Sequence, residues 1–166
     1  MKFKITIAIL LFLFGCKSMD NINYSVYLFN KGEYTKVKSE LSEKIVNILK
    51  DIVLDTDDML RLHVSKERIE TIKKNNSGIE VIFKKKNSIT SKKMGVFEIN
   101  KILIPFEGDF VGNENSPVVT VFLGNNGYIT GPLRNSDGLK KLEEIKKVIA
   151  SENFKSTSAD SGHSDQ

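Results

Sequence analysis

The stretch VVTVFLGNNGYIT, residues 118–130, decides the fold class of this 166-residue chain. Two runs rich in β-branched and aromatic residues enclose the turn at 124–127, and its Asn-Gly pair is a typical hairpin signal. Because strands joined by short turns pair with each other, this pattern predicts an antiparallel sheet. Further segments that fit a strand are residues 24–29, 60–64, 79–83 and 96–106.

Two amphipathic helices flank most of these strands, at about residues 35–53 and 138–150. In each segment apolar residues recur at spacings of three and four, which is the period of a helix with one buried face. These residues are Leu41, Ile45, Ile48, Leu49 and Ile52 in the first segment, and Leu139, Leu142, Ile145, Val148 and Ile149 in the second. We therefore predict an α+β fold, an antiparallel sheet with two amphipathic helices packed on one face.

Residues 66–74 fit two structures. Ile69 and Ile72 are three apart, which favours a helical turn, whereas Asn-Asn-Ser-Gly at 75–78 is a hairpin signal. The sequence alone leaves this alternative open.

The first sixteen residues have the order of a secretory signal. Lys2 and Lys4 precede an apolar run at 5–14, and Gly15 and Cys16 follow it. A run of ten is shorter than the roughly 20 residues that a membrane-spanning helix needs. A buried N-terminal helix or strand is the alternative, but the order basic, apolar, small and Cys favours the signal.

The end of this segment, Leu13-Phe14-Gly15-Cys16, resembles the lipobox of bacterial lipoproteins. Leu13, Gly15 and Cys16 match that pattern, and Phe14 is bulkier than the usual residue. The resemblance implies cleavage between Gly15 and Cys16, a diacylglycerol thioether on Cys16, and often acylation, as with palmitate, of the new amine. Because a single acyl chain binds a membrane only marginally, two or three chains would be needed to hold the protein there.

These features predict the domain organisation and the location of the chain. We expect a signal peptide at 1–15, a lipidated Cys and tether at 16–23, one α+β domain at 24–150 and a disordered tail at 151–166. Lys17 rather than Asp follows Cys16, which by the lipoprotein sorting rule favours the outer membrane of the cell envelope. Cys16 is the sole cysteine, so the chain has no intrachain disulfide.

The charge of the chain argues against a nucleic-acid partner. Removal of Lys2 and Lys4 with the signal lowers the formal net charge from +4 to +2, whereas nucleic-acid binding needs a concentrated basic face. If residues 73–86 form a hairpin, seven lysines gather at its end and beside it. This patch would bind an anionic membrane surface or an acidic partner. The alternative is that the lysines only give solubility and protect a sheet edge. The patch consists of Lys73, Lys74, Lys84, Lys85, Lys86, Lys92 and Lys93.

The histidines give no support for a hydrolytic triad. His163 lies in the predicted tail, and His63 alternates with leucines as a solvated strand residue does. The chain lacks a Gly-x-Ser-x-Gly motif that would supply the nucleophile. We therefore expect no catalytic residues.

Two acidic clusters fail as metal sites. The spacing of Asp55, Asp57 and Asp58 resembles the first positions of a calcium-binding loop, but Leu60 occupies the position where such a loop needs a glycine. Glu107 and Asp109 lie in a glycine-containing loop that fits an ordinary turn. We expect neither a metal nor another cofactor.

The sequence thus predicts a lipid-anchored envelope lipoprotein that presents a small non-catalytic binding domain. Its partner would be an envelope protein, a glycan or an anionic surface. The first alternative is an inhibitor or immunity-type lipoprotein that blocks a hydrolase through loop 107–117. A less favoured alternative is a carboxylate-based hydrolase, which would need two buried acids with raised pKa values in one cleft.

Overall fold

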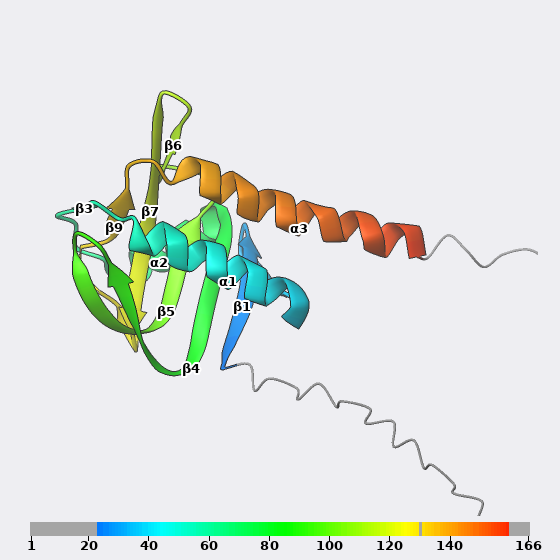
Figure 1. The fold of residues 1–166 in the computed structure, drawn as a ribbon, viewed down its shortest axis with the longest axis horizontal. Coiled ribbons are helices and arrows are strands. Elements are labelled where there is room, and N and C mark those ends of the chain that lie inside the picture. Colours follow the sequence, from blue (N-terminus) through cyan, green and yellow to red (C-terminus); the bar gives the residue numbers. More distant parts are fainter. Residues whose placement is uncertain (1–22, 130, 160–166) are drawn as a thin grey trace, which may run out of the picture.

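The computed structural model describes residues 23–129 and 131–159 (Figure 1). The signal segment, Cys16 and His163 lie outside the described residues, so the predictions made for them rest on the sequence. Among the described residues, no helix is long and apolar enough to cross a membrane.

Within the described residues, nine strands form one sheet in which every pairing is antiparallel. The strand order is β2-β1-β4-β5-β7-β9-β3, and β6 and β8 also pair with β7. The strands are β1 Tyr24–Asn30, β2 Glu33–Lys36, β3 Asp58–Met59, β4 Ser77–Ser91, β5 Gly95–Pro105, β6 Val111–Asn113, β7 Ser116–Asn125, β8 Gly127–Tyr128 and β9 Leu133–Asn135.

The first face of the sheet carries two helices, α1 (Ser39–Leu54) and α3 (Leu139–Ala159), which lie side by side in front of the strands in Figure 1. Their apolar stripes pack on every second residue of the central strands. The α+β fold with both helices on one face is therefore confirmed. The strand residues of this core are Val26, Ile79, Val81, Phe83, Ile89, Ile99, Ile102, Ile104, Val119, Val121, Leu123 and Leu133.

The second face carries a third helix, α2 (Lys66–Asn75), which the sequence left ambiguous. The intervening strand residues Phe29, Leu103 and Phe122 form a separate cluster with Ile69 and Ile72 of this helix. The side-chain oxygen of Ser65 accepts a hydrogen bond from the Arg68 amide and caps the first turn. Because α2 leads directly into β4, residues 75–78 do not form the turn of a hairpin.

Three other boundaries differ from the predicted ones. The first helix begins at Ser39, because residues 33–36 pair with β1 instead. In the segment 60–64 no residue belongs to a strand, and only Asp58–Met59 pairs with β9. Helix α3 runs on to Ala159, into the segment predicted as a tail.

Candidate functional site

One hollow of the described surface is a groove beside β4, a strand whose pairing changes along its length. The first half of this strand pairs with β1 on one side and β5 on the other, but residues 87–91 pair with β5 alone. Between Ile82 and Asn87 the register with β5 shifts, and Lys84, Lys85 and Lys86 occupy this bulge. Beyond it the β4–β5 hairpin reaches the end of α1, where the Lys92 amide donates to the Leu54 carbonyl at 2.9 Å.

The groove lies between this outer half of β4 and α1, and its volume is about 1100 Å³. Polar side chains line its walls, and Val46, Phe83, Ile89 and Ile99 supply buried apolar surface beside them. The polar lining residues are Asn23, Ser39, Glu43, Asn47, Lys50, Asp51, Lys84, Asn87, Ser88 and Thr90.

The charges of the groove are unevenly placed. The α1 wall holds both signs, since Lys50 lies there with Glu43 and Asp51. The β4 wall holds Lys84, and the sequence has no acid between Glu80 and Glu98. At the edge of the groove, burial and then the charge of Glu43 raise the pKa of Tyr24. The groove is thus suited to binding, with a basic side along β4.

The seven lysines predicted as one patch are not brought together. Lys73 is buried, with 9% of its surface exposed. Lys74 lies in the last turn of α2, which meets β4 at the opposite end of its paired half from the bulge. Lys92 forms an ion pair with Asp55 at 2.7 Å near the hairpin tip. The sequence suggested one patch because it allowed a 73–86 hairpin, and α2 replaces that hairpin. Exposed Lys84, Lys85 and Lys86 remain as the basic group beside the groove.

A buried polar cluster on the second face was missed by sequence reasoning. The Lys73 ammonium donates to Glu80 Oε1 at 3.0 Å and also pairs with Oε2, and the Tyr128 hydroxyl donates to Oε1. Burial alone would lower the pKa of Lys73, but the hydrogen bond and charge of Glu80 outweigh it and raise that pKa. Burial and the Glu80 charge strongly raise the pKa of Tyr128. Glu80 is bonded to both Lys73 and Tyr128, so this cluster joins α2, β4 and β8.

The Lys73 ammonium also lies near two aromatic rings. Its Nζ is 5.8 Å from the ring centroid of Tyr34 and 5.8 Å from that of Tyr128. The only advance sign of the cluster was an acid in the middle of the apolar strand 79–83. An acid at such a position needs a partner when the residue is buried.

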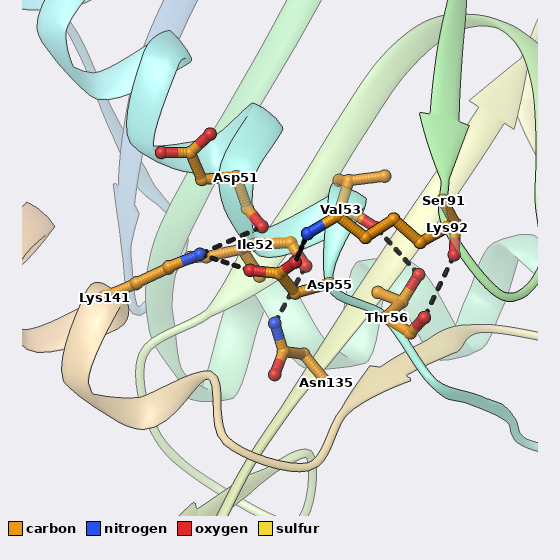
Figure 2. Close-up of polar contacts among 9 residues, drawn as sticks. All are labelled: Asp51, Ile52, Val53, Asp55, Thr56, Ser91, Lys92, Asn135 and Lys141. Carbon is orange, nitrogen blue, oxygen red and sulfur yellow. Dashed lines mark hydrogen bonds and ion pairs between the residues drawn. The ribbon is translucent and has the colours of Figure 1, made fainter.

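The three acids at 55–58 each have their own protein partners rather than a common centre. Figure 2 shows Asp55 between Lys92 and Lys141, with nitrogen–oxygen distances of 2.7 and 2.6 Å. Asp57 accepts hydrogen bonds from the amide and hydroxyl of Ser136, and Asp58 lies 3.7 Å from Arg134. The hydrogen bonds from the two lysines lower the pKa of Asp55 to about 2.

Neighbouring polar contacts in Figure 2 join α1 to the strands. The Asn135 side chain donates to the Ile52 carbonyl at 2.9 Å, and the Ser91 hydroxyl donates to the Thr56 carbonyl at 3.0 Å. We name this group, with Asp55, Lys92 and Lys141, the α1 clasp. It joins the C-terminal end of α1 to the β4–β5 turn, to β9 and to α3.

His63 is exposed and lines a shallower hollow of about 600 Å³ with Asp57, Asp58 and Arg61. A catalytic histidine needs a carboxylate to orient its ring. The Asp57 carboxylate, which lines this hollow, instead accepts a hydrogen bond from the Ser136 hydroxyl. Across the described residues, no group of three or more His, Cys, Asp or Glu side chains is placed to hold a metal ion.

Loop 107–117 contains β6 and its turn into β7, and in Figure 1 this hairpin projects beyond α3. Its tip is held by the Asn113 side chain, which accepts from the amides of Asn115 and Ser116 at 3.0 and 3.2 Å. At the base, Glu107 accepts from the amide and hydroxyl of Ser77, and these bonds lower its pKa. The loop is therefore well braced, and Glu107 is bonded to protein.

Comparisons with protein-family models, with curated proteins and with solved structures give no match.

Proposed function

We propose that this chain is a lipid-anchored lipoprotein of the bacterial envelope whose domain binds a partner without catalysing a reaction. The groove between α1 and β4 carries the binding part of the proposal, because it combines volume, buried apolar surface and polar walls. Lipobox residues Leu13, Gly15 and Cys16 carry the anchoring part.

The nature of the groove favours binding over catalysis. Its lining has hydroxyl groups but no histidine that would act as a base toward them. Outside the groove, the carboxyl groups of Asp55, Glu67 and Glu107 have lowered pKa values, the opposite of what a general acid requires. A carboxylate-based hydrolase is therefore the less favoured proposal.

The anchor and the groove would lie close together. Asn23 and Tyr24 line the groove, and six residues separate Cys16 from Asn23. Even a fully extended tether of this length spans only about 25 Å. A partner in the groove would thus be held near the membrane surface.

The anchor is tested by labelling with radioactive palmitate in a bacterial host. We expect label on the wild-type chain and none on Cys16→Ser, since the thiol is the acceptor. Density-gradient fractionation of the labelled envelope should place the chain with the outer membrane. Equal labelling of both chains, or none on either, would remove the anchoring proposal.

A second function is favoured by the projecting β6–β7 hairpin. A braced loop that stands out from its domain is suited to enter the cleft of a hydrolase, as an inhibitor or immunity-type lipoprotein would do. The test adds purified protein to envelope hydrolases acting on labelled peptidoglycan. We expect the wild-type protein to inhibit the hydrolase, Glu114→Lys at the exposed tip to abolish the inhibition, and Lys84→Glu to leave it intact. This result would favour inhibition over groove binding.

A further inference from the structure

The groove exposes a free strand edge. Residues 87–91 of β4 pair with β5 on one side, and among the described residues no strand pairs with their other side. In an antiparallel ladder, alternate residues direct their backbone N–H and C=O groups to opposite edges. The outer half of β4 therefore presents donors and acceptors to the groove, where another strand can pair with them.

The dimensions of the groove suit a short extended peptide. The α1 wall runs from Ser39 to Leu54, and a helix of this length spans about 24 Å. An extended chain rises about 3.3 Å per residue, so about seven residues fit along this wall. A strand laid between a helix and a sheet edge is one of the recurring modes of peptide recognition.

The lining also matches the alternation of a strand. Ile89 and Phe83 give the groove apolar surface, whereas Lys84 and Asn87 lie at its polar side. A bound strand would point every second side chain toward the apolar surface and the others toward solvent.

Charge identifies the kind of peptide. The solvent-facing side chains of an added strand would lie beside Lys84, with Lys85 and Lys86 next to it in the bulge. The β4 side offers no acid to balance these lysines, and opposite charges across neighbouring strands attract. The basic side of the groove thus calls for acidic residues in the occupant.

We propose that the groove binds an extended, acidic peptide segment of a partner protein, which adds to the free edge of β4 as a new strand beside α1. This inference rests on the proposed binding function but not on the lipid anchor.

The test begins with random dodecapeptides displayed on phage and selected on the mature protein in detergent micelles. The most enriched peptide is then synthesised with single backbone N-methyl groups at successive positions. We expect enrichment of acidic sequences, and a loss of affinity of tenfold or more when methylation falls on alternate residues. Failure to enrich peptides, or equal effects at all positions, would overturn the proposal, because strand addition uses only one edge of the peptide.

The site is located by hydrogen exchange and by charge variants. The bound peptide should slow amide exchange in residues 84–91 but not in α2. The variant Lys84→Glu, Lys85→Glu, Lys86→Glu should weaken binding at least tenfold. A control with the same charge change on exposed lysines elsewhere, Lys36→Glu, Lys74→Glu, Lys140→Glu, should bind within about twofold of wild type. Equal weakening of both variants would overturn the site.

Other occupants give different results. If a second copy of this chain fills the groove, protection of residues 84–91 will rise with protein concentration in the absence of peptide. If the tether fills it, protection will be present in the free protein and will vanish on deletion of residues 17–22. Either result would overturn the proposal. A negative peptide result with palmitate on Cys16 would leave the anchoring proposal standing.

Discussion

The core between the sheet and helices α1 and α3 consists mainly of aliphatic side chains, whereas the core under α2 is smaller and lies beside a buried ion pair. The first core runs across both helices and the central strands. The second contains six buried residues, with Lys73 and Glu80 beside them. Ile82 and Tyr34 remain 42% and 47% exposed.

The difference follows from the lengths of the covering helices. Helix α1 has 16 residues and α2 has ten, so α2 buries fewer apolar side chains. Hydrophobic stabilisation scales with the apolar area removed from water. We infer that the α1 face provides most of the stability, while the α2 face depends on a polar cluster that is costly to break.

The largest effect should come from truncating matched isoleucines on the two faces. Ile52 of α1 is 0% exposed and Ile72 of α2 is 4% exposed. We expect Ile52→Ala to lower the free energy of unfolding by about 4 kcal/mol, and Ile72→Ala by about 2 kcal/mol, because the smaller cluster can relax around the cavity. Urea denaturation followed by circular dichroism measures both. Equal losses would contradict the inferred difference between the faces.

The sequence predicted the first face far better than the second. The runs of β-branched and aromatic residues at 79–83 and 118–123 and the apolar stripe of 35–53 each involve several residues, so the antiparallel sheet and α1 were predictable. Only Ile69 and Ile72 marked α2, and two residues do not establish a period. Local turn chemistry at 75–78 then favoured a hairpin that the structure does not contain.

The candidate site depends on features that a single sequence does not encode locally. Lys84 was identifiable as part of a basic run, but the groove beside it requires the register shift in β4 and the packing of α1. Asp55 and Lys141 are 86 residues apart in the chain and meet only because α3 lies beside α1. Composition and periodicity give the elements, whereas these contacts depend on how the elements pack.

A somewhat smaller effect is expected from breaking the buried ion pair. Glu80→Gln should destabilise the protein by about 3 kcal/mol, because it leaves the Lys73 ammonium buried without a counter-charge. The raised pKa of Lys73 adds a pH test. Its pairing stabilises the fold at neutral pH, and this contribution should fade as pH rises above about 10.5 toward the higher folded pKa.

The matched control removes both charges. The double variant Lys73→Met, Glu80→Gln should recover most of the lost stability, since neither partner remains as an uncompensated charge. Thermal unfolding of the wild type, the single variant and the double variant completes the comparison. If the double variant were as unstable as Glu80→Gln alone, shape rather than charge would explain the cluster.

The smallest effect should appear at the α1 clasp under acid. Asp55 has its pKa lowered to about 2 by Lys141 and Lys92, whereas an unfolded aspartate titrates near 4. The contribution is thus fully present above pH 4 and is lost as pH falls toward 2. Because 39% of the Asp55 side chain is exposed, solvent screening limits it to about 1 kcal/mol.

The measurement is urea unfolding of wild type and Asp55→Asn at pH 6 and pH 2.5. The variant should be about 1 kcal/mol less stable at pH 6, and only about a third of this difference should remain at pH 2.5. One molar salt should shrink the difference at pH 6, because a partly exposed pair is screened. A difference as large at pH 2.5 as at pH 6 would mean that Asp55 acts through packing, and the acid sensitivity would then have to arise elsewhere. In the expected case, the partly exposed ion pair of Asp55 on the α1 face would contribute far less to stability than the buried Lys73–Glu80 pair under α2.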